Sequence, residues 1–208
     1  LYEQISIWNG PAVVRLLPEP EALPYERVAA DRYVEIEKLQ VLASLANPAF
    51  SEGPPSLTIV SASALMQKLT SFKQFVGACH TIRVGTEIKP FDLLGRWQAI
   101  GYRLEDMVEV PGTISHRGGI IDIYPLAGDL PARLEFFGDT IESIRLFDPT
   151  TQRSLEKVTF VSIAPATELL APLFNHDSLL NYLPQNSLLV LDESDGIQSA
   201  MADLDAKA

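Results

Sequence analysis

The chain has 208 residues, of which 47% are hydrophobic and 21% are charged, and this composition excludes global disorder. Its 27 acidic side chains outnumber its 16 basic ones, for a formal net charge of −11, which argues against non-specific nucleic-acid binding. A single cysteine, no signal peptide and no apolar run near the ~20 residues of a bilayer span predict a cytoplasmic protein without a membrane segment. Because the sequence begins with Leu1 and not methionine, we expect a piece of a longer chain.

Residues 1–80 have the pattern of an incomplete α/β domain. Ser61 or Ser63 is suited to cap a short helix that runs to Leu69. Strands that alternate with helices favour a parallel sheet covered by helices. The expected elements before that cap are a buried strand, a helix and a second buried strand, at residues 12–17, 31–46 and 57–60.

Residues 81–165 change character, because strands follow one another closely. A helix is expected over 91–100, with Gly101 at its C-terminal end. Turns rich in Gly, Asp and Pro separate the strands, which is typical of an antiparallel sheet in a small α+β unit. The strands are expected over residues 107–110, 113–116, 120–124, 132–137, 140–147 and 157–163.

Residues 166–208 return to α/β character, with an apolar strand over 187–191 and a helix from Ser194 or Asp195. The strand and the following Asp192-Glu193 resemble a Walker B segment. A nucleotide site also needs a GxxxxGK[ST] loop, and the sequence has none, so we expect no nucleotide hydrolysis. The simplest prediction is an α/β domain interrupted by a small antiparallel α+β insert.

No residue cluster points to catalysis or to a bound cofactor or metal. His80, His116 and His176 are far apart and have no neighbouring ligands at metal-binding spacing. Cys79 is expected to be a buried, small apolar residue. The sequence also lacks the GxSxG motif that would make a serine a nucleophile.

The strand expected over 132–137 carries an unusual combination of side chains. Alternation places Arg133, Glu135 and Phe137 together on the face away from the core. Arginine beside an exposed aromatic ring is typical of a protein–protein hot spot. The alternative is that Phe137 packs under a loop and that Arg133 pairs with Glu135 or Glu142.

Arg117 is presented at a strand end, because Gly118-Gly119 permits a tight turn directly after it. Its side chain either is solvated there or binds a phosphate or a base edge. No cluster of basic residues surrounds it in the sequence.

Three motifs resemble those of the bacterial transcription-repair coupling factors, and the excision-repair helicase UvrB shares the first two. The double glycine and the Gln-Arg-Ser ending are more similar to the coupling factors. Weaker similarity is seen in 23–26 and 61–69. The motifs are PGTISHRGGIIDIYP at 111–125, RLEFFGD at 133–139 and FDPTTQRS at 147–154.

This resemblance implies a UvrB-homology module in which domain 2 interrupts a degenerate helicase-like α/β domain. It divides the chain into a partial 1A-like part (1–80), a domain 2-like part (81–165) and a 1B-like continuation (166–208). In the family, domain 2 binds the damage-recognition protein UvrA. The family's contact positions match Arg117, Arg133 and Phe137 of this sequence.

The resemblance also implies partners that lie beyond this segment. In the family, a C-terminal domain covers the UvrA-binding face, and other domains engage RNA polymerase and DNA through a motor that uses ATP and Mg²⁺. The expected function is therefore a non-catalytic adaptor fragment that docks UvrA, without a cofactor of its own. The alternative is a piece of a UvrB-type ATP-dependent helicase that engages DNA.

Overall fold

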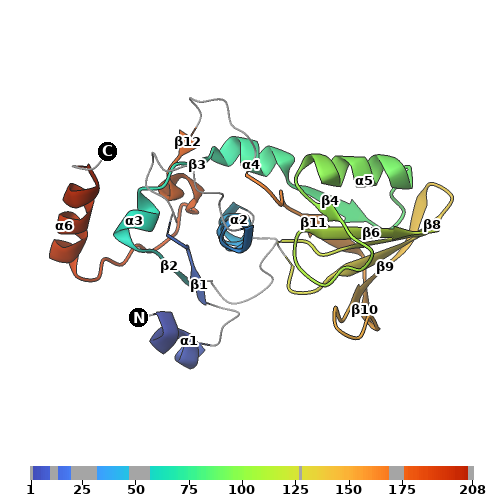
Figure 1. Cartoon of the computed structure of the whole chain (residues 1–208), viewed down its shortest axis with the longest axis horizontal. Helices are drawn as coiled ribbons and strands as arrows, with labels where there is room; N and C mark the ends of the chain where they lie inside the picture. The colour runs from blue at the N-terminus through green and yellow to red at the C-terminus, as the bar shows by residue number, and fades with distance from the viewer. Residues whose placement is uncertain are drawn as a thin grey trace. The chain divides into compact units, whose positions relative to one another are not determined.

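The computed structural model describes residues 2–9, 14–19, 32–46, 57–126, 128–168 and 176–205. The chain divides into two compact units, which are described separately (Figure 1). We call residues 1–72 and 170–208 the flanking unit, and residues 73–169 the central unit. Both helices and strands are present, and most strand pairs are antiparallel, so the mixed α/β architecture with an antiparallel sheet is confirmed.

The flanking unit contains one parallel strand pair and one antiparallel strand pair. β1 pairs with β2 in parallel, as expected for α/β material, and β12 pairs with β3 in antiparallel orientation. Ser61 caps α3, because its hydroxyl accepts a hydrogen bond from the Ala64 amide at 3.2 Å. The elements are α1 (Tyr2–Asn9), β1 (Val14–Leu16), α2 (Arg32–Ala46), β2 (Leu57–Ile59), α3 (Ala62–Leu65), β3 (Leu69–Thr70), β12 (His176–Asp177), the 3-10 helix η2 (Leu179–Tyr182) and α6 (Ser194–Asp205).

Contacts far apart in sequence hold this unit together. The hydroxyl of buried Tyr182 donates to the Thr70 carbonyl at 2.6 Å, and its ring meets Phe72 edge-on. The Phe72 amide donates to the carboxylate of Asp177 at 2.8 Å. These contacts join the part of the flanking unit that precedes the central unit in the sequence to the part that follows it.

The central unit is built on a six-stranded sheet in the order β10-β9-β8-β7-β6-β5. All neighbours in it are antiparallel except β5 and β6. A second antiparallel pair joins β11 to β4. The elements are α4 (Phe72–Ala78), β4 (His80–Arg83), α5 (Pro90–Ala99), β5 (Arg103–Leu104), β6 (Thr113–Arg117), β7 (Ile120–Ile123), β8 (Ala132–Phe137), β9 (Thr140–Phe147), β10 (Ser154–Val158) and β11 (Phe160–Ile163).

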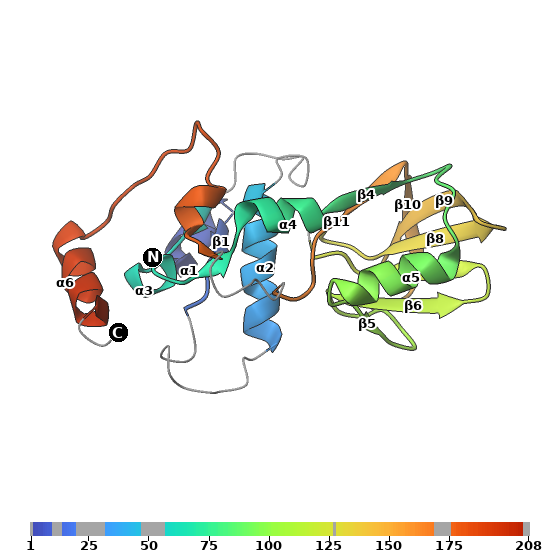
Figure 2. The ribbon, with the colours of Figure 1, turned by 90° about the horizontal axis from the view of Figure 1, so that it is seen from above.

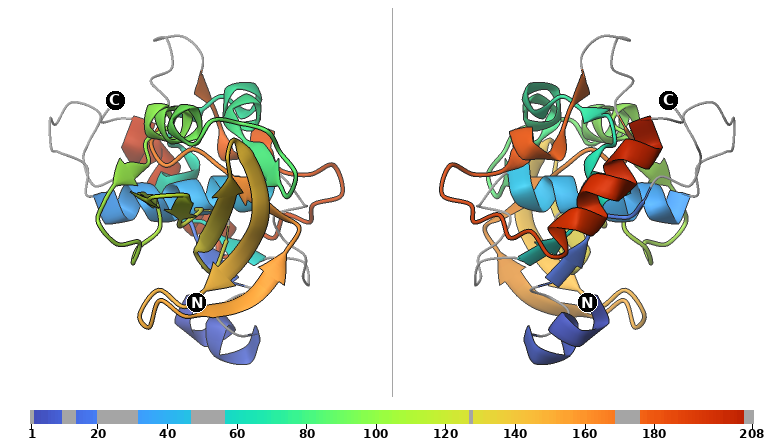
Figure 3. Two further views of the ribbon diagram at one scale, coloured as in Figure 1. Left: turned by 90° about the vertical axis from the view of Figure 1, so that its right-hand side faces the viewer. Right: turned by 90° about the vertical axis from the view of Figure 1, so that its left-hand side faces the viewer.

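Helix α5 covers one face of the six-stranded sheet, as Figure 2 and the left view of Figure 3 both show. Apolar residues of the helix and of the strands make a core between them. Because strand residues alternate, the other face of the same strands is free to carry polar side chains. The buried core residues are Leu93, Leu94 and Trp97 of α5 with Ile114, Ile121, Leu134 and Ile144 of the sheet.

Directly after α5, residues 100–102 pack closely against residues 164–167, and we call this contact between the two segments the crossing after α5. Gly101 has φ +98°, and the Ala166 amide donates to the Ile100 carbonyl at 2.7 Å. The hydroxyl of buried Tyr102 donates to the Ala164 carbonyl at 2.9 Å. Burial raises the pKa of Tyr102, so this phenol stays a hydrogen-bond donor.

Several expected elements differ from those observed. Residues 107–110 form no strand, because the sheet edge is made by β5 and the Thr113 hydroxyl bonds to the Val110 carbonyl at 2.6 Å in a turn. The strand expected over 157–163 is two strands, β10 and β11, which belong to different sheets. The chain leaves the first sheet at Thr159, whose carbonyl accepts from the Val84 amide.

Three corrections concern the flanking unit. The apolar run 187–191 is not a strand; it has no regular structure and its side chains are exposed. β2 is not buried, since Leu57 is exposed. α3 ends at Leu65 and not at Leu69, because Leu69 is already the first residue of β3. Of the run expected over 12–17, residues 12 and 13 lie outside the described residues.

Within the described part of the chain, no helix has the length and apolar character needed to cross a membrane.

Candidate functional site

The face of the six-stranded sheet opposite α5 carries a row of charged residues. Asp122 of β7 is in register with Arg133 of β8, which is in register with Arg145 of β9. Their neighbours along each strand point to the core and are apolar. The alternation of the strands thus places three charged side chains side by side on the face opposite α5.

Asp122 is the centre of this charge cluster and is only 1% exposed. One of its oxygens accepts from Arg133 Nε and the other from Arg133 Nη2, both at 2.8 Å. The second oxygen also accepts from Arg117 Nη2 at 3.2 Å. A buried carboxylate with a bidentate arginine and a second arginine is well compensated for the loss of water.

Arg133 is held on several sides. Its guanidinium lies 4.6 Å from the centre of the Phe147 ring, and its Nη1 is 3.5 Å from the Gln152 carbonyl. The hydrogen bond to Asp122 raises the pKa of Arg133, so it stays charged. Its side chain is 17% exposed. The alternative pairing with Glu135 or Glu142 is wrong, because Arg133 pairs with Asp122 and Glu135 pairs with Arg145 at 3.2 Å.

Arg117 and Phe137 lie at one end of the sheet and are open to solvent. The Arg117 side chain is 55% exposed, and Phe137 is 79% exposed. The Phe136 amide donates to the Gly119 carbonyl at 2.8 Å, which joins the turn after Arg117 to the end of β8. The alternative in which Phe137 packs under a loop is therefore wrong.

Sequence reasoning named Arg117, Arg133 and Phe137 but missed Asp122, which links the two arginines. The available signal was a single carboxylate in the otherwise apolar strand Ile120–Ile123. An acidic side chain between isoleucines is costly to bury unless it is paired. Its partners come from two other strands, so the local pattern did not name them.

The other expected features do not join this cluster. Cys79 is free and half-buried, and burial raises its pKa to about 11, so it is a poor nucleophile. Within the residues that the structure describes, His, Cys, Asp and Glu nowhere form a group of three that could hold a metal ion. His80 is half-buried next to Trp97, with Trp97 Nε1 donating to His80 Nε2 at 3.0 Å.

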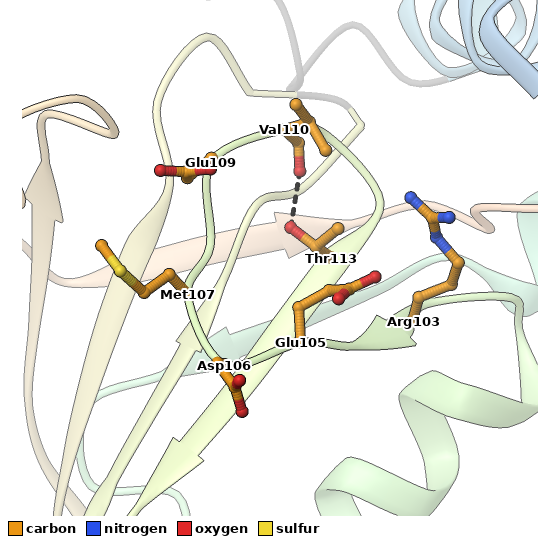
Figure 4. A pocket seen from close by; sticks show the side chains of 7 residues that line it. All are labelled: Arg103, Glu105, Asp106, Met107, Glu109, Val110 and Thr113. Atoms are coloured by element: carbon orange, nitrogen blue, oxygen red, sulfur yellow. Dashed lines mark hydrogen bonds between the residues drawn. The ribbon is translucent and has the colours of Figure 1, made fainter.

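A shallow depression lies at the β5 edge of the sheet (Figure 4). Three carboxylates and one arginine surround it, and the Thr113 hydroxyl is engaged by the Val110 carbonyl. The one hydroxyl among the lining side chains is therefore already engaged by the backbone. The lining residues are Arg103, Glu105, Asp106, Met107, Glu109, Val110 and Thr113.

The His80–Trp97 bond predicts that stability depends on pH. Burial is the main reason that the pKa of His80 lies below its usual value, so the neutral ring is favoured in the folded chain. The unfolded chain binds more protons in the window just below pH ~6.5, so stability is lost as pH falls through it. We expect the unfolding free energy to drop less between pH 7.5 and 5.5 in His80→Gln than in the parent.

Urea unfolding followed by Trp97 fluorescence in a Trp8→Phe background would measure this, since Trp8 is exposed and would otherwise add signal. The Trp8→Phe chain with His80 intact is the reference for the His80→Gln chain, because the two chains have the same carboxylates. Equal pH slopes in the two chains would contradict the role given to His80.

Comparisons with known proteins place this geometry in a family. Residues 81–169 match the family model described as the UvrB interaction domain, so most of the central unit is a domain of that class. The chain is 36% identical over 157 residues to the transcription-repair-coupling factor of Bacillus subtilis (strain 168). It is 38% identical over 163 residues to that of Myxococcus xanthus and 31% over 168 residues to that of Escherichia coli (strain K12).

These matches cover 76%, 77% and 81% of the chain. The resemblance seen in the sequence motifs is thus confirmed, and the chain is similar to one segment of the transcription-repair-coupling factors. It spans only 13–14% of the length of these relatives.

Proposed function

We propose that this chain is a non-catalytic adaptor that docks UvrA and thereby brings nucleotide excision repair to stalled RNA polymerase. The observation that carries the proposal is Phe137, a large aromatic residue that is 79% exposed at the end of β8, the strand that also contributes Arg133 to the Arg117–Asp122–Arg133 cluster. The description of the family as an interaction domain supports it. The coupling factors among its relatives support the link to transcription and repair.

The chemistry of this face fits a protein partner. An aromatic ring exposed on a sheet gains apolar burial when a pocket closes over it, and arginines on the same sheet can pair with carboxylates. Arg117, Arg133 and Phe137 are the residues that we propose contact UvrA. Phe137 would be the apolar anchor.

The wider assembly is part of the same proposal. Residues 1–80 and 166–208 would be the 1A-like and 1B-like parts of a degenerate helicase-like domain, and the parallel β1–β2 pair supports an α/β origin. Residues 81–165 would be the UvrA-binding domain. In the longer cytoplasmic protein, a C-terminal domain would cover this face, and an ATP- and Mg²⁺-dependent motor would act on DNA and RNA polymerase.

The rival function, a piece of a UvrB-type DNA helicase, is less well supported. The relatives described above are coupling factors, and the chain has a net charge of −11. Salt-sensitive binding of this chain to DNA would favour the rival. A third possibility, a module that only shields neighbouring domains, would leave UvrA unbound.

The test is a calorimetric titration of the chain into purified UvrA at moderate salt. We expect the parent to bind and Phe137→Ala to bind about 30-fold more weakly, because loss of an aromatic anchor costs about 2 kcal/mol or more. The ring leaves no buried cavity when removed, so the fold should be unchanged.

Phe91→Ala is the matched control. Phe91 is 72% exposed, but it lies on α5, which covers the opposite face of the sheet. This control should bind UvrA as the parent does. A parent that does not bind UvrA while its circular dichroism shows a folded chain would overturn the proposal, as would equal losses in both variants.

A further inference from the structure

We infer that Asp122 is a positioning residue for UvrA docking, which orients Arg117 so that it meets a carboxylate of the partner, while Arg133 acts mainly as a support. This inference rests on the proposed function. The cluster is defined here as Arg117, Asp122 and Arg133, and its members come from the consecutive strands β6, β7 and β8.

The two arginines differ in what they can offer a partner. Arg133 directs Nε and Nη2 at Asp122 and Nη1 at the Gln152 carbonyl, and it stacks on Phe147. Most of its donors are used, and 17% of its side chain is exposed. Its main role in the free chain is therefore to fix the carboxylate of Asp122 in one orientation.

Arg117 is the member with donors to spare. Among the described residues it makes one such bond, from Nη2 to Asp122, and a guanidinium has five N–H groups. Its side chain is 55% exposed. The anchored Asp122 oxygen holds one edge of this guanidinium, so the outward edge keeps the fork geometry that a carboxylate needs.

The charges of the cluster point to the same partner chemistry. Two arginines and one aspartate leave one positive charge, which suits a single carboxylate on UvrA. Without Asp122, Arg117 would be a flexible side chain at a strand end, and ordering it on binding would cost conformational entropy.

Positioning and simple charge attraction predict opposite results for Asp122→Asn. This change adds one net positive charge, so attraction alone would tighten binding to a carboxylate. The amide NH₂ of asparagine, however, would face an arginine N–H whichever way it turns, because both Asp122 oxygens accept from arginine. At least one of the three bonds would be lost in either orientation, so the cluster would no longer fix the side chain at position 122, and binding would weaken.

The experiment measures the affinity of the chain for UvrA with parent, Asp122→Asn and the control Glu135→Gln. Glu135 lies on the same face and pairs with Arg145, so its replacement changes the net charge equally and leaves the three hydrogen bonds of the cluster in place. We expect a loss of about tenfold or more for Asp122→Asn, mainly in the dissociation rate, and no loss for the control. Near-ultraviolet circular dichroism of each chain confirms the fold before titration.

A double-mutant cycle separates positioning from damage to the fold. In an Arg117→Ala background, Asp122→Asn should weaken binding by less than about threefold further, because the arginine that it positions is gone. A loss of the same size in both backgrounds would overturn the inference, as would tighter or unchanged binding of Asp122→Asn. In this experiment, failure of the parent itself to bind would instead count against the proposed function.

Discussion

Replacing Asp122 by alanine is expected to lower the unfolding free energy by about 3–5 kcal/mol, because the change leaves buried arginine charge without its partner. Arg133 is the group at risk, since two of its nitrogens point at the carboxylate from 2.8 Å. The Asp122 carboxylate is 1% exposed and the Arg133 side chain 17% exposed, so water replaces the lost bonds of Arg133 only in part. Breaking such a pair costs more than the pair contributes in place.

Urea unfolding monitored by far-ultraviolet circular dichroism would measure this loss. Glu135→Ala is the matched control, because Glu135 also pairs with an arginine on this face but is about one-third exposed. Its removal should cost about 1 kcal/mol or less. If the two alanine variants lost equal stability, the burial of Asp122 would not have the importance given to it.

Gly101→Ala is expected to destabilise the chain by about 2–5 kcal/mol, through strain in the backbone and a clash in the crossing after α5. Gly101 has φ +98°, which residues with a Cβ adopt only at a cost. A Cβ there would lie 2.6 Å from both Cβ and Cγ2 of Thr167 and 2.7 Å from its amide nitrogen. The backbone at Thr167 cannot easily move away from the added Cβ, because the amide of the preceding residue, Ala166, is hydrogen-bonded to the Ile100 carbonyl.

Gly95→Ala is the control for this prediction, and it should have the opposite sign. Gly95 lies within α5, and a Cβ there would meet nothing within 4 Å. Alanine is a better helix former than glycine, so a gain of about 0.5–1 kcal/mol is expected. Thermal unfolding of both variants beside the parent would decide. A neutral Gly101→Ala would mean that the crossing adapts without cost.

The sequence predicts the sheet best where the information is local. The strands expected over 132–137 and 140–147 are the observed β8 and β9, since alternation and the turn residues Gly138-Asp139 define both. The strand expected over 107–110 is wrong, because hydrophobic content alone did not reveal that the chain turns there. The unexpected edge strand β5 pairs in parallel with β6, and such a pairing leaves no local signal.

In the candidate site, too, the features set by local sequence are predicted and those set by strand pairing are not. Exposure of Phe137 follows from strand alternation, which is a property of β8 alone. The partner of Arg133 depends on which strands are neighbours and in which register, so the nearby Glu135 was a natural but wrong candidate. Apolar side chains at 187–191 similarly suggested a buried strand, although the structure leaves them exposed.

The proposed contact residue Arg133 stands on a strand with paired neighbours on both sides, and Phe137 is the last residue of that strand and pairs with Thr140 of β9. Little backbone freedom is left to lose when a partner arrives, so most of the gross interaction energy can appear as affinity. The same construction limits adaptation, because the backbone of Arg133 cannot shift without distorting β7 or β9. A surface of this kind selects a partner whose shape already matches it.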